Sequence, residues 1–339
     1  MKILLKIIMN SLLFVIRLTV IARSERSERR GNPYLPKSTK PEYYYIMKKN
    51  FCALFLLLFP LLCFSQNDFH FSLAPRLSFT YGELNEILYG YNDEIVSQLD
   101  WEQKPILNIG LATSVNFKSF IISADFDYGI SLPGSYMYDS DWDDGEKYSF
   151  TKHPIRNLNN IDTALTAAYQ IKATSKISVI PLLQFNYLYS SFEAGNGSGV
   201  RRGRDIRVYG IDYKRHSFFL FTGLSLKIQP AEICCVTTDF LAAPWNYQDS
   251  YDFHHGKNHP FSSNDIQYGY FTKYKTAIKA DFTLDKKLSL QLFTNLLFGF
   301  PDKGDFYSDY YGKMTKIESQ QSGADIYYVK AGLALNFSF

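Results

Sequence analysis

The sequence predicts an all-β protein, namely a ten-stranded antiparallel transmembrane β-barrel that protrudes on the extracellular side. Three observations lead to this fold. From about residue 68 onward, apolar and polar residues alternate with a period of two, which gives strands with one oily and one wet face. Tyr, Phe and Trp make up 17% of the 339 residues, and aromatic side chains favour strands. After residue 66, no apolar run is long enough for a spanning helix.

The first 66 residues are expected to lie outside the barrel. Residues 47–66 have the form of a signal peptide, with the charged start Met47-Lys48-Lys49 and an apolar run up to Phe64. Residues 1–46 precede this signal, and we favour a start codon that was assigned too early. The alternative is an N-terminal extension that anchors the chain on the cytoplasmic side. We therefore assign the barrel to residues 67–339.

The expected mature protein is acidic although the whole chain carries a net charge of +3. Residues 1–46 contribute +6 and residues 47–66 contribute +2, so the remaining residues carry −5. An acidic exported protein favours cationic partners and gives no support to nucleic-acid binding. Of the four cysteines, only Cys234 and Cys235 remain, and adjacent strand residues point to opposite faces. No disulfide framework is expected.

Ten strands follow one another along the barrel. Their expected ranges are 69–90, 95–117, 119–142, 154–172, 176–193, 206–228, 233–252, 267–284, 287–300 and 322–339. Their connections alternate between tight turns, such as 117–118 and 285–286, and long polar loops at 143–153, 194–205, 253–266 and 301–321. Short turns mark the periplasmic side of such barrels and long loops mark the outside.

The third strand shows the pattern most clearly. Its even-numbered residues from Phe120 to Leu132 are apolar, whereas Ser123, Asp125 and Asp127 lie on the other face. The alternation continues from about 119 to 142, roughly twice the 9–11 residues that cross a membrane. The barrel should therefore stand well above the lipid and offer a rigid wall there.

The last strand favours a membrane barrel over a soluble sandwich, which would bury its oily face against a second sheet. One apolar face is formed by Tyr327, Val329, Ala331, Leu333, Leu335, Phe337 and Phe339. A closing strand of this form that ends in Phe resembles the C-terminal assembly signal of outer-membrane β-barrels. We expect the protein in the cell outer membrane.

Two acidic clusters lie where long strands run out into long loops, and both should face the cell exterior. They are Asp139-Ser140-Asp141-Trp142 and Asp252-Phe253-His254. Residues two apart in a strand point the same way, so Asp139 projects with Asp141 and Asp252 projects with His254. Strand parity turns all four inward, provided that no bulge at Pro133-Gly134 resets the register. Two carboxylates would then face a carboxylate and an imidazole.

These clusters resemble the omptin family of outer-membrane endopeptidases. The resemblance includes Ser97-Gln98-Leu99-Asp100-Trp101, Thr151-Lys152-His153-Pro154, the ten strands and the closing strand, and it covers nearly all of 68–339. It implies an aspartic-type hydrolase in which water is the nucleophile, without a metal or a covalent intermediate. Asp252 would orient His254, His254 would take the proton from water, and Asp139 and Asp141 would hold that water.

The resemblance also implies a pocket for a basic side chain, from which this chain departs in part. Glu86 matches an acidic residue that omptins use to bind such a side chain. The second acid of that pocket, two residues before the Asp of the Asp-x-His motif, is here Ser250. Asp249 is next to it, but a one-residue offset turns it to the other face. Preference for Arg or Lys is expected to be weakened.

The expected partners are cationic peptides or proteins and outer-membrane lipid, with no nucleic acid, and the barrel should act as a monomer. No cofactor is expected, and lipopolysaccharide is a candidate activator. The aromatic and basic cluster that binds lipopolysaccharide in family members is not recognisable around Phe185 to Phe192.

Three other interpretations remain open. The chain could be a catalytically silent barrel that serves adhesion or binding through its loops, or a passive pore, although ten strands leave little open lumen. His254, His255 and His259 with Asp252 could instead form a zinc site, but adjacent strand residues such as His254 and His255 diverge.

Overall fold

The computed structural model describes residues 69–256, 260–309 and 314–339, and all structural statements below refer to these. The expected signal peptide and the segment before it lie outside the described residues, so their assignment stays a prediction. None of the helices among the described residues is long and apolar enough to cross a membrane. Helical structure there consists of one short 3-10 turn, η2, Tyr91–Asp93.

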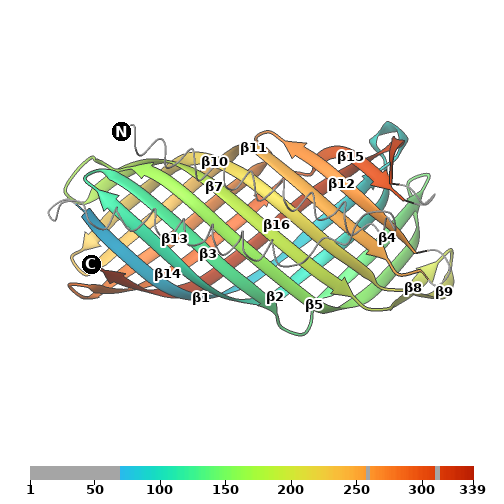
Figure 1. Cartoon of the computed structure of the whole chain (residues 1–339), viewed down its shortest axis with the longest axis horizontal. Helices are drawn as coiled ribbons and strands as arrows, with labels where there is room; N and C mark the ends of the chain where they lie inside the picture. Colours follow the sequence, from blue (N-terminus) through green and yellow to red (C-terminus); the bar gives the residue numbers. More distant parts are fainter. Residues whose placement is uncertain (1–68, 257–259, 310–313) are drawn as a thin grey trace, which may run out of the picture. The chain divides into compact units, whose positions relative to one another are not determined.

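The described chain is built from strands. Their bounds are β1 Phe69–Tyr89, β2 Ile95–Phe117, β3 Phe120–Ser131, β4 Tyr136–Asp143, β5 Glu146–Tyr169, β6 Ile171–Lys172, β7 Ile177–Ala194, β8 Gly197–Arg201, β9 Arg204–Val208, β10 Ile211–Ala231, β11 Cys234–His254, β12 Phe261–Gly269, β13 Lys273–Asp285, β14 Leu288–Gly299, β15 Asp302–Ser308 and β16 Thr315–Ser338. Long strands run obliquely side by side (Figure 1).

Ten of these strands pair antiparallel in a closed ring, which confirms the predicted fold. The order around the ring is β1, β2, β3, β5, β7, β10, β11, β13, β14 and β16, and β16 pairs back with β1. At one end β4 extends the line of β3, β12 leads into β13 and β15 extends β14. These extensions keep the wall paired beyond the ten-stranded part.

The expected long loops are mostly strand. β4 and β5 meet at a two-residue turn of Asp144 and Gly145, which both have positive φ. Residues 194–205 form most of the β8–β9 hairpin, and much of 301–321 belongs to β15 and β16. The sequence pattern relied on an oily outward face, and that face is lost where a strand leaves the lipid. Polar strands in water were therefore mistaken for loops.

The outward face of the ten-stranded part is a belt of exposed apolar side chains. Leu77 and Phe79 are 42% and 43% exposed, whereas Ser78 between them is fully buried toward the lumen. Other members of this lipid-facing belt are Ile109, Leu111, Phe126, Ile130, Leu183, Leu224, Leu226, Phe240, Ile278, Leu292, Leu333 and Leu335. A continuous apolar surface of this kind suits hydrocarbon and not water.

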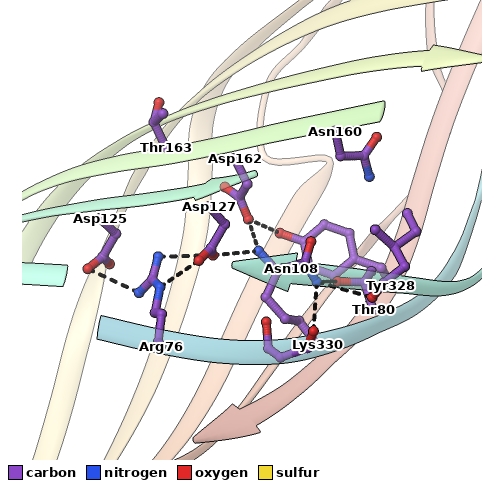
Figure 2. Close-up of polar contacts among 12 residues, drawn as sticks. Arg76, Thr80, Asn108, Asp125, Asp127, Asn160, Asp162, Thr163, Tyr328 and Lys330 are labelled. Carbon is purple, nitrogen blue, oxygen red and sulfur yellow. Dashed lines mark hydrogen bonds and ion pairs between the residues drawn. The ribbon is translucent and has the colours of Figure 1, made fainter. Parts of the chain in front are cut away.

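Within the belt, the lumen is filled by paired charges. Arg76 donates from Nε and Nη2 to the two oxygens of Asp127 at 2.6 and 2.9 Å, and its Nη1 lies 3.2 Å from Asp125. Lys330 bonds Asp127 at 3.0 Å and also bonds Asp162 (Figure 2). Because each of these three carboxylates meets a cation, none of them is left buried without a charged partner.

Farther along the lumen, Trp101, Phe192 and Tyr213 form a buried aromatic cluster, which we call the floor. Trp101 is fully buried, stacks on Tyr213 with ring centroids 4.9 Å apart and contacts Phe192 at 5.2 Å. Trp101 pairs with Leu84, two residues before Glu86 on β1. The inward residues that follow Leu84 along the wall therefore lie beyond the floor, at the end of the barrel that we call the mouth.

Removal of the Lys330 ammonium tests the charge network. Lys330→Met leaves Asp162 without its closest cation, so we expect a loss of about 3–5 kcal/mol in the free energy of unfolding, as for other broken buried pairs. Lys303→Met is the control, because Lys303 and its partner Asp93 are 41% and 68% exposed and such pairs contribute about 0–1 kcal/mol. Urea unfolding of the refolded barrel in detergent measures both, and equal losses would contradict the network's role.

Candidate active site

Four expected site residues lie at the mouth on two separate parts of the wall. β4 carries Asp139 and Asp141, and the last residues of β11 carry Asp252 and His254. The break between β3 and β4 at 132–135 does not reset the parity. Asp127 before the break and Met137 after it are both buried, so odd-numbered residues face inward on both sides.

The Asp252 carboxylate holds the His254 ring. His254 Nε2 lies 2.7 Å from Asp252 Oδ2. The other carboxylate oxygen, Oδ1, accepts hydrogen bonds from the backbone N–H of Ser263 at 3.0 Å and from the Ser263 hydroxyl. Ser263 is directly opposite Asp252 in the β11–β12 pair. The carboxylate is thus fixed from the neighbouring strand.

A second contact fixes the plane of the imidazole. Phe261 lies opposite His254 in the β11–β12 pair and stacks on it, with centroids 4.2 Å apart and planes 14° apart. With Nε2 bonded to Asp252, Nδ1 is the nitrogen left to accept a proton. These two contacts restrain the ring, so this atom is held in a defined orientation.

The charges of the pair shift both pKa values. Burial opposes ionisation of Asp252, but His254 and the hydrogen bonds from Ser263 outweigh it, and the pKa of Asp252 is lowered. Burial likewise disfavours the imidazolium, yet Asp252, followed by Asp139 and Asp141, raises the pKa of His254 above its ordinary value. The imidazole is a stronger base here than in water.

The aspartate pair acts on this histidine from the opposite wall. Burial and then the Asp141 carboxylate raise the pKa of Asp139 to about 7, against the effects of His254 and Arg201. Arg201 lies on β8, which pairs with β5 beside β4. Because Asp139 and His254 each shift the pKa of the other, the two pairs share one electrostatic site.

His153 on β5 is a neutral neighbour that sequence reasoning noted only as part of a motif. Its Nδ1 lies 2.9 Å from the carbonyl oxygen of Gly195 and its Nε2 lies 3.0 Å from Thr151 Oγ1. Burial is the main factor that lowers the pKa of His153. A Cβ at Gly197 would lie 2.6 Å from the ring, so β8 packs on His153 only because this residue is glycine.

Both expected substrate-binding residues face the mouth. Glu86 on β1 and Ser250 on β11 are buried. Asp249 is less buried than Ser250 and accepts a hydrogen bond from Asn264 at 2.9 Å, as expected of a residue on the opposite face. Sequence reasoning missed Asp265, which lies directly opposite Ser250 in β12. The position of Asp265 opposite Ser250 follows from the register of β11 and β12, and this register could be predicted only if the first residue of β12 were known.

The zinc alternative relied on neighbouring histidines. His255 pairs with Asp212 on β10, its Nε2 lying 3.0 Å from Asp212 Oδ2. His259 lies outside the described residues. Across the part of the chain that the structure describes, no three His, Cys, Asp or Glu side chains are grouped so that they could hold a metal ion.

Comparison with known structures finds a match that shares this fold. The crystal structure of the outer membrane protease OmpT from Escherichia coli superposes with a TM-score of 0.71 at 16% sequence identity, and the match covers 81% of this chain and 99% of that one. OprG from Pseudomonas aeruginosa has a TM-score of 0.34 at 12% identity, and covers 80% of this chain and 98% of its own. The Pseudomonas putida toluene transporter TodX has a TM-score of 0.29 at 8% identity, over 80% and 90% of the two chains.

The family comparison is broader than any single structural match. No curated protein matches the chain. The model of the Omptin family matches residues 67–339, which include every described strand. This match and the shared fold show that the chain belongs to the omptin family of outer-membrane proteases.

Proposed function

We propose that this protein is an outer-membrane endopeptidase that hydrolyses peptide bonds near basic residues, through water activated by an Asp-His pair and an Asp-Asp pair. The observation that supports it is the electrostatic coupling of His254 and Asp139 across the mouth. Titratable groups with mutually shifted pKa values in a cleft are typical of acid-base sites. Family membership supports the same class of reaction.

The proposed reaction uses water as the nucleophile. Asp139 and Asp141 accept hydrogen bonds from this water and hold it on one side. Neutral His254 takes one of its protons at Nδ1 while the oxygen adds to the peptide carbonyl carbon. Asp252 stabilises the imidazolium that forms. Collapse of the tetrahedral intermediate breaks the C–N bond, and His254 returns the proton to the leaving amine.

The site is proposed to face the cell exterior. It lies beyond the lipid-facing belt, at the end that carries the β8–β9 hairpin. The opposite end has tight turns such as Lys118 between β2 and β3, as on the periplasmic side of other barrels. Substrates there would be cationic peptides or exposed basic segments of proteins. One chain supplies every proposed catalytic group, so a monomer suffices and no cofactor takes part.

Lipopolysaccharide is proposed as an activator rather than a cofactor. The belt has apolar members on nine of the ten ring strands, so the protein works in contact with outer-membrane lipid. Activity assays therefore include refolded protein with and without lipopolysaccharide, and higher activity with it would support this role.

Replacement of the proposed base tests the mechanism. His254→Ala should lower kcat/KM for a fluorogenic peptide with one Arg by about 10²–10⁴-fold, the usual contribution of a positioned acid-base group. The matched control is His255→Ala, because His255 is the adjacent residue, is more exposed and pairs with Asp212 outside the site. Wild-type activity in His254→Ala would overturn the proposal and leave a barrel that binds without catalysis.

The pH profile tests the role of Asp252. Because only neutral His254 can take a proton, kcat/KM should be present above the raised pKa of His254 and fall as pH decreases through it. Asp252→Asn removes the main group that raises this pKa, so the acidic limb should move to lower pH while the plateau falls. Asp249→Asn, on the outer face of the same strand, should leave the limb in place. An unmoved limb in Asp252→Asn would contradict the assignment.

A further inference from the structure

Two buried carboxylate oxygens at the mouth, Glu86 Oε2 and Asp265 Oδ1, have no hydrogen-bond partner among the described residues. The hydroxyl of Ser250 lies between these two side chains and can still donate to or accept from a ligand. Asp265 is 2% exposed and Ser250 is 1% exposed. Burial of a polar atom without a partner is costly, so each such atom needs a physical reason, and a bound polar ligand is one such reason.

Strand register brings Asp265 beside Ser250. The two residues are directly opposite each other in the β11–β12 pair, and Arg215 is opposite Ser250 on its other side in β10. Glu86 reaches the same corner from β1. Burial first, then Asp252 and Asp265, raises the pKa of Glu86 well above its ordinary value. Burial first, then Asp252, also raises the pKa of Asp265 well above its ordinary value, against the effects of Arg215 and of a hydrogen bond with Glu86.

Arg215 does not neutralise this corner by direct contact. Its Nε donates to Tyr213 Oη at 2.6 Å, and Nη1 and Nη2 donate to the backbone oxygens of Asp325 and Asn85 at 2.8 and 2.6 Å. Throughout the described ranges, no Lys, Arg or His side chain lies within ion-pair distance of Glu86 or Asp265. With both carboxylates ionised, two negative charges face one positive charge, so one further cation would balance the corner.

The corner is also close to the proposed catalytic groups. Glu86, Leu99 and Asp139 form one row across β1, β2 and β4. Asp252 is two residues beyond Ser250 on the same face of β11. A side chain held at Glu86 and Asp265 would therefore belong to a residue next to the bond that is cleaved.

We propose that Asp265 is the second carboxylate of a pocket for one basic substrate side chain, with Glu86 as the first carboxylate and Ser250 as a neutral donor or acceptor between them. The proposal rests on the proposed function. A guanidinium fits this set well because its planar donors can bond two carboxylates at once. Ser250 alone predicts a weakened preference for basic residues. The Asp265 carboxylate on the neighbouring strand would then restore this preference.

Selectivity for charge tests the pocket. Two peptides are compared that differ only in Arg or the uncharged isostere citrulline at the cleavage position, and the ratio of their kcat/KM values is measured. Asp265→Asn should lower this ratio about tenfold or more, chiefly through KM for the Arg peptide, because one charge-assisted contact is lost. The citrulline peptide should be cleaved as by the wild type.

Two further variants make the test specific. The double variant Ser250→Asp with Asp265→Ser moves the carboxylate back across the strand pair, and it should recover most of the lost ratio. Asp249→Asn removes a carboxylate one residue away on the outer face and should leave the ratio unchanged. Circular dichroism confirms that each variant is folded. An unchanged ratio in folded Asp265→Asn, or an equal fall in Asp249→Asn, would overturn the proposal.

Failure of the endopeptidase assignment can be distinguished from failure of the pocket. If the wild type cleaves neither peptide, the endopeptidase assignment fails, and the pocket is then tested by binding of agmatine, a small guanidinium ligand. Binding to the wild type that is at least about tenfold weaker in Asp265→Asn would support the pocket. Equal binding by both proteins, or none by the wild type, would overturn it.

Discussion

Closure of the ten-stranded ring is the constraint on which the rest of the structure depends. In a closed antiparallel ring every strand has a partner on both sides, so each inward residue belongs to a row that its neighbours fix. The row of Tyr213, Asp252 and Ser263 shows the effect, because Ser263 can bond Asp252 only in this register. A slip of one residue would turn the proposed catalytic set outward.

Buried carboxylates in the lumen differ in whether they have a cationic partner. At the level of the lipid-facing belt, Asp127 and Asp162 meet Arg76 or Lys330 directly, and the paired charges fill the space. At the mouth, Asp265 has an oxygen without a partner although it is buried. Evenly paired charges need nothing further for stability, whereas an unpaired acid at the mouth is more stable when a cation arrives. The first arrangement is structural and the second suits a ligand.

The sequence was sufficient to predict the ten strands of the ring, but not the shorter strands that extend the wall beyond it. Alternation identified all ten ring strands because their outward residues, such as Leu77 and Phe79, are apolar. It failed for β8, β9 and β15, where both faces meet water or polar neighbours and no oily face marks the strand. Parity placed Asp139 and Asp252 on inward faces, since parity needs only a local strand.

Contacts between strands could not be predicted from the sequence, for a related reason. The stacking of Phe261 on His254 and the position of Asp265 beside Ser250 depend on where β12 starts after its connection, and turn length cannot be read from alternation. The raised pKa of Asp139 depends in the same way on burial by distant strands. Local periodicity predicts faces, and only register predicts neighbours.

Parity and register together explain how a carboxylate can change strands without leaving its place. An acid at position 249 in place of 250 is shifted by one residue along the strand. Asp249 therefore lies on the outer face, where it accepts a hydrogen bond from Asn264. An acid at position 265 in place of 250 lies on the neighbouring strand but in the same row and on the same face, because residues 250 and 265 are directly opposite each other. Directly opposite residues of an antiparallel pair have Cβ atoms only about 4.5–5.5 Å apart. A negative charge on either strand therefore reaches the same ligand, and the choice of strand is free as long as the row is kept.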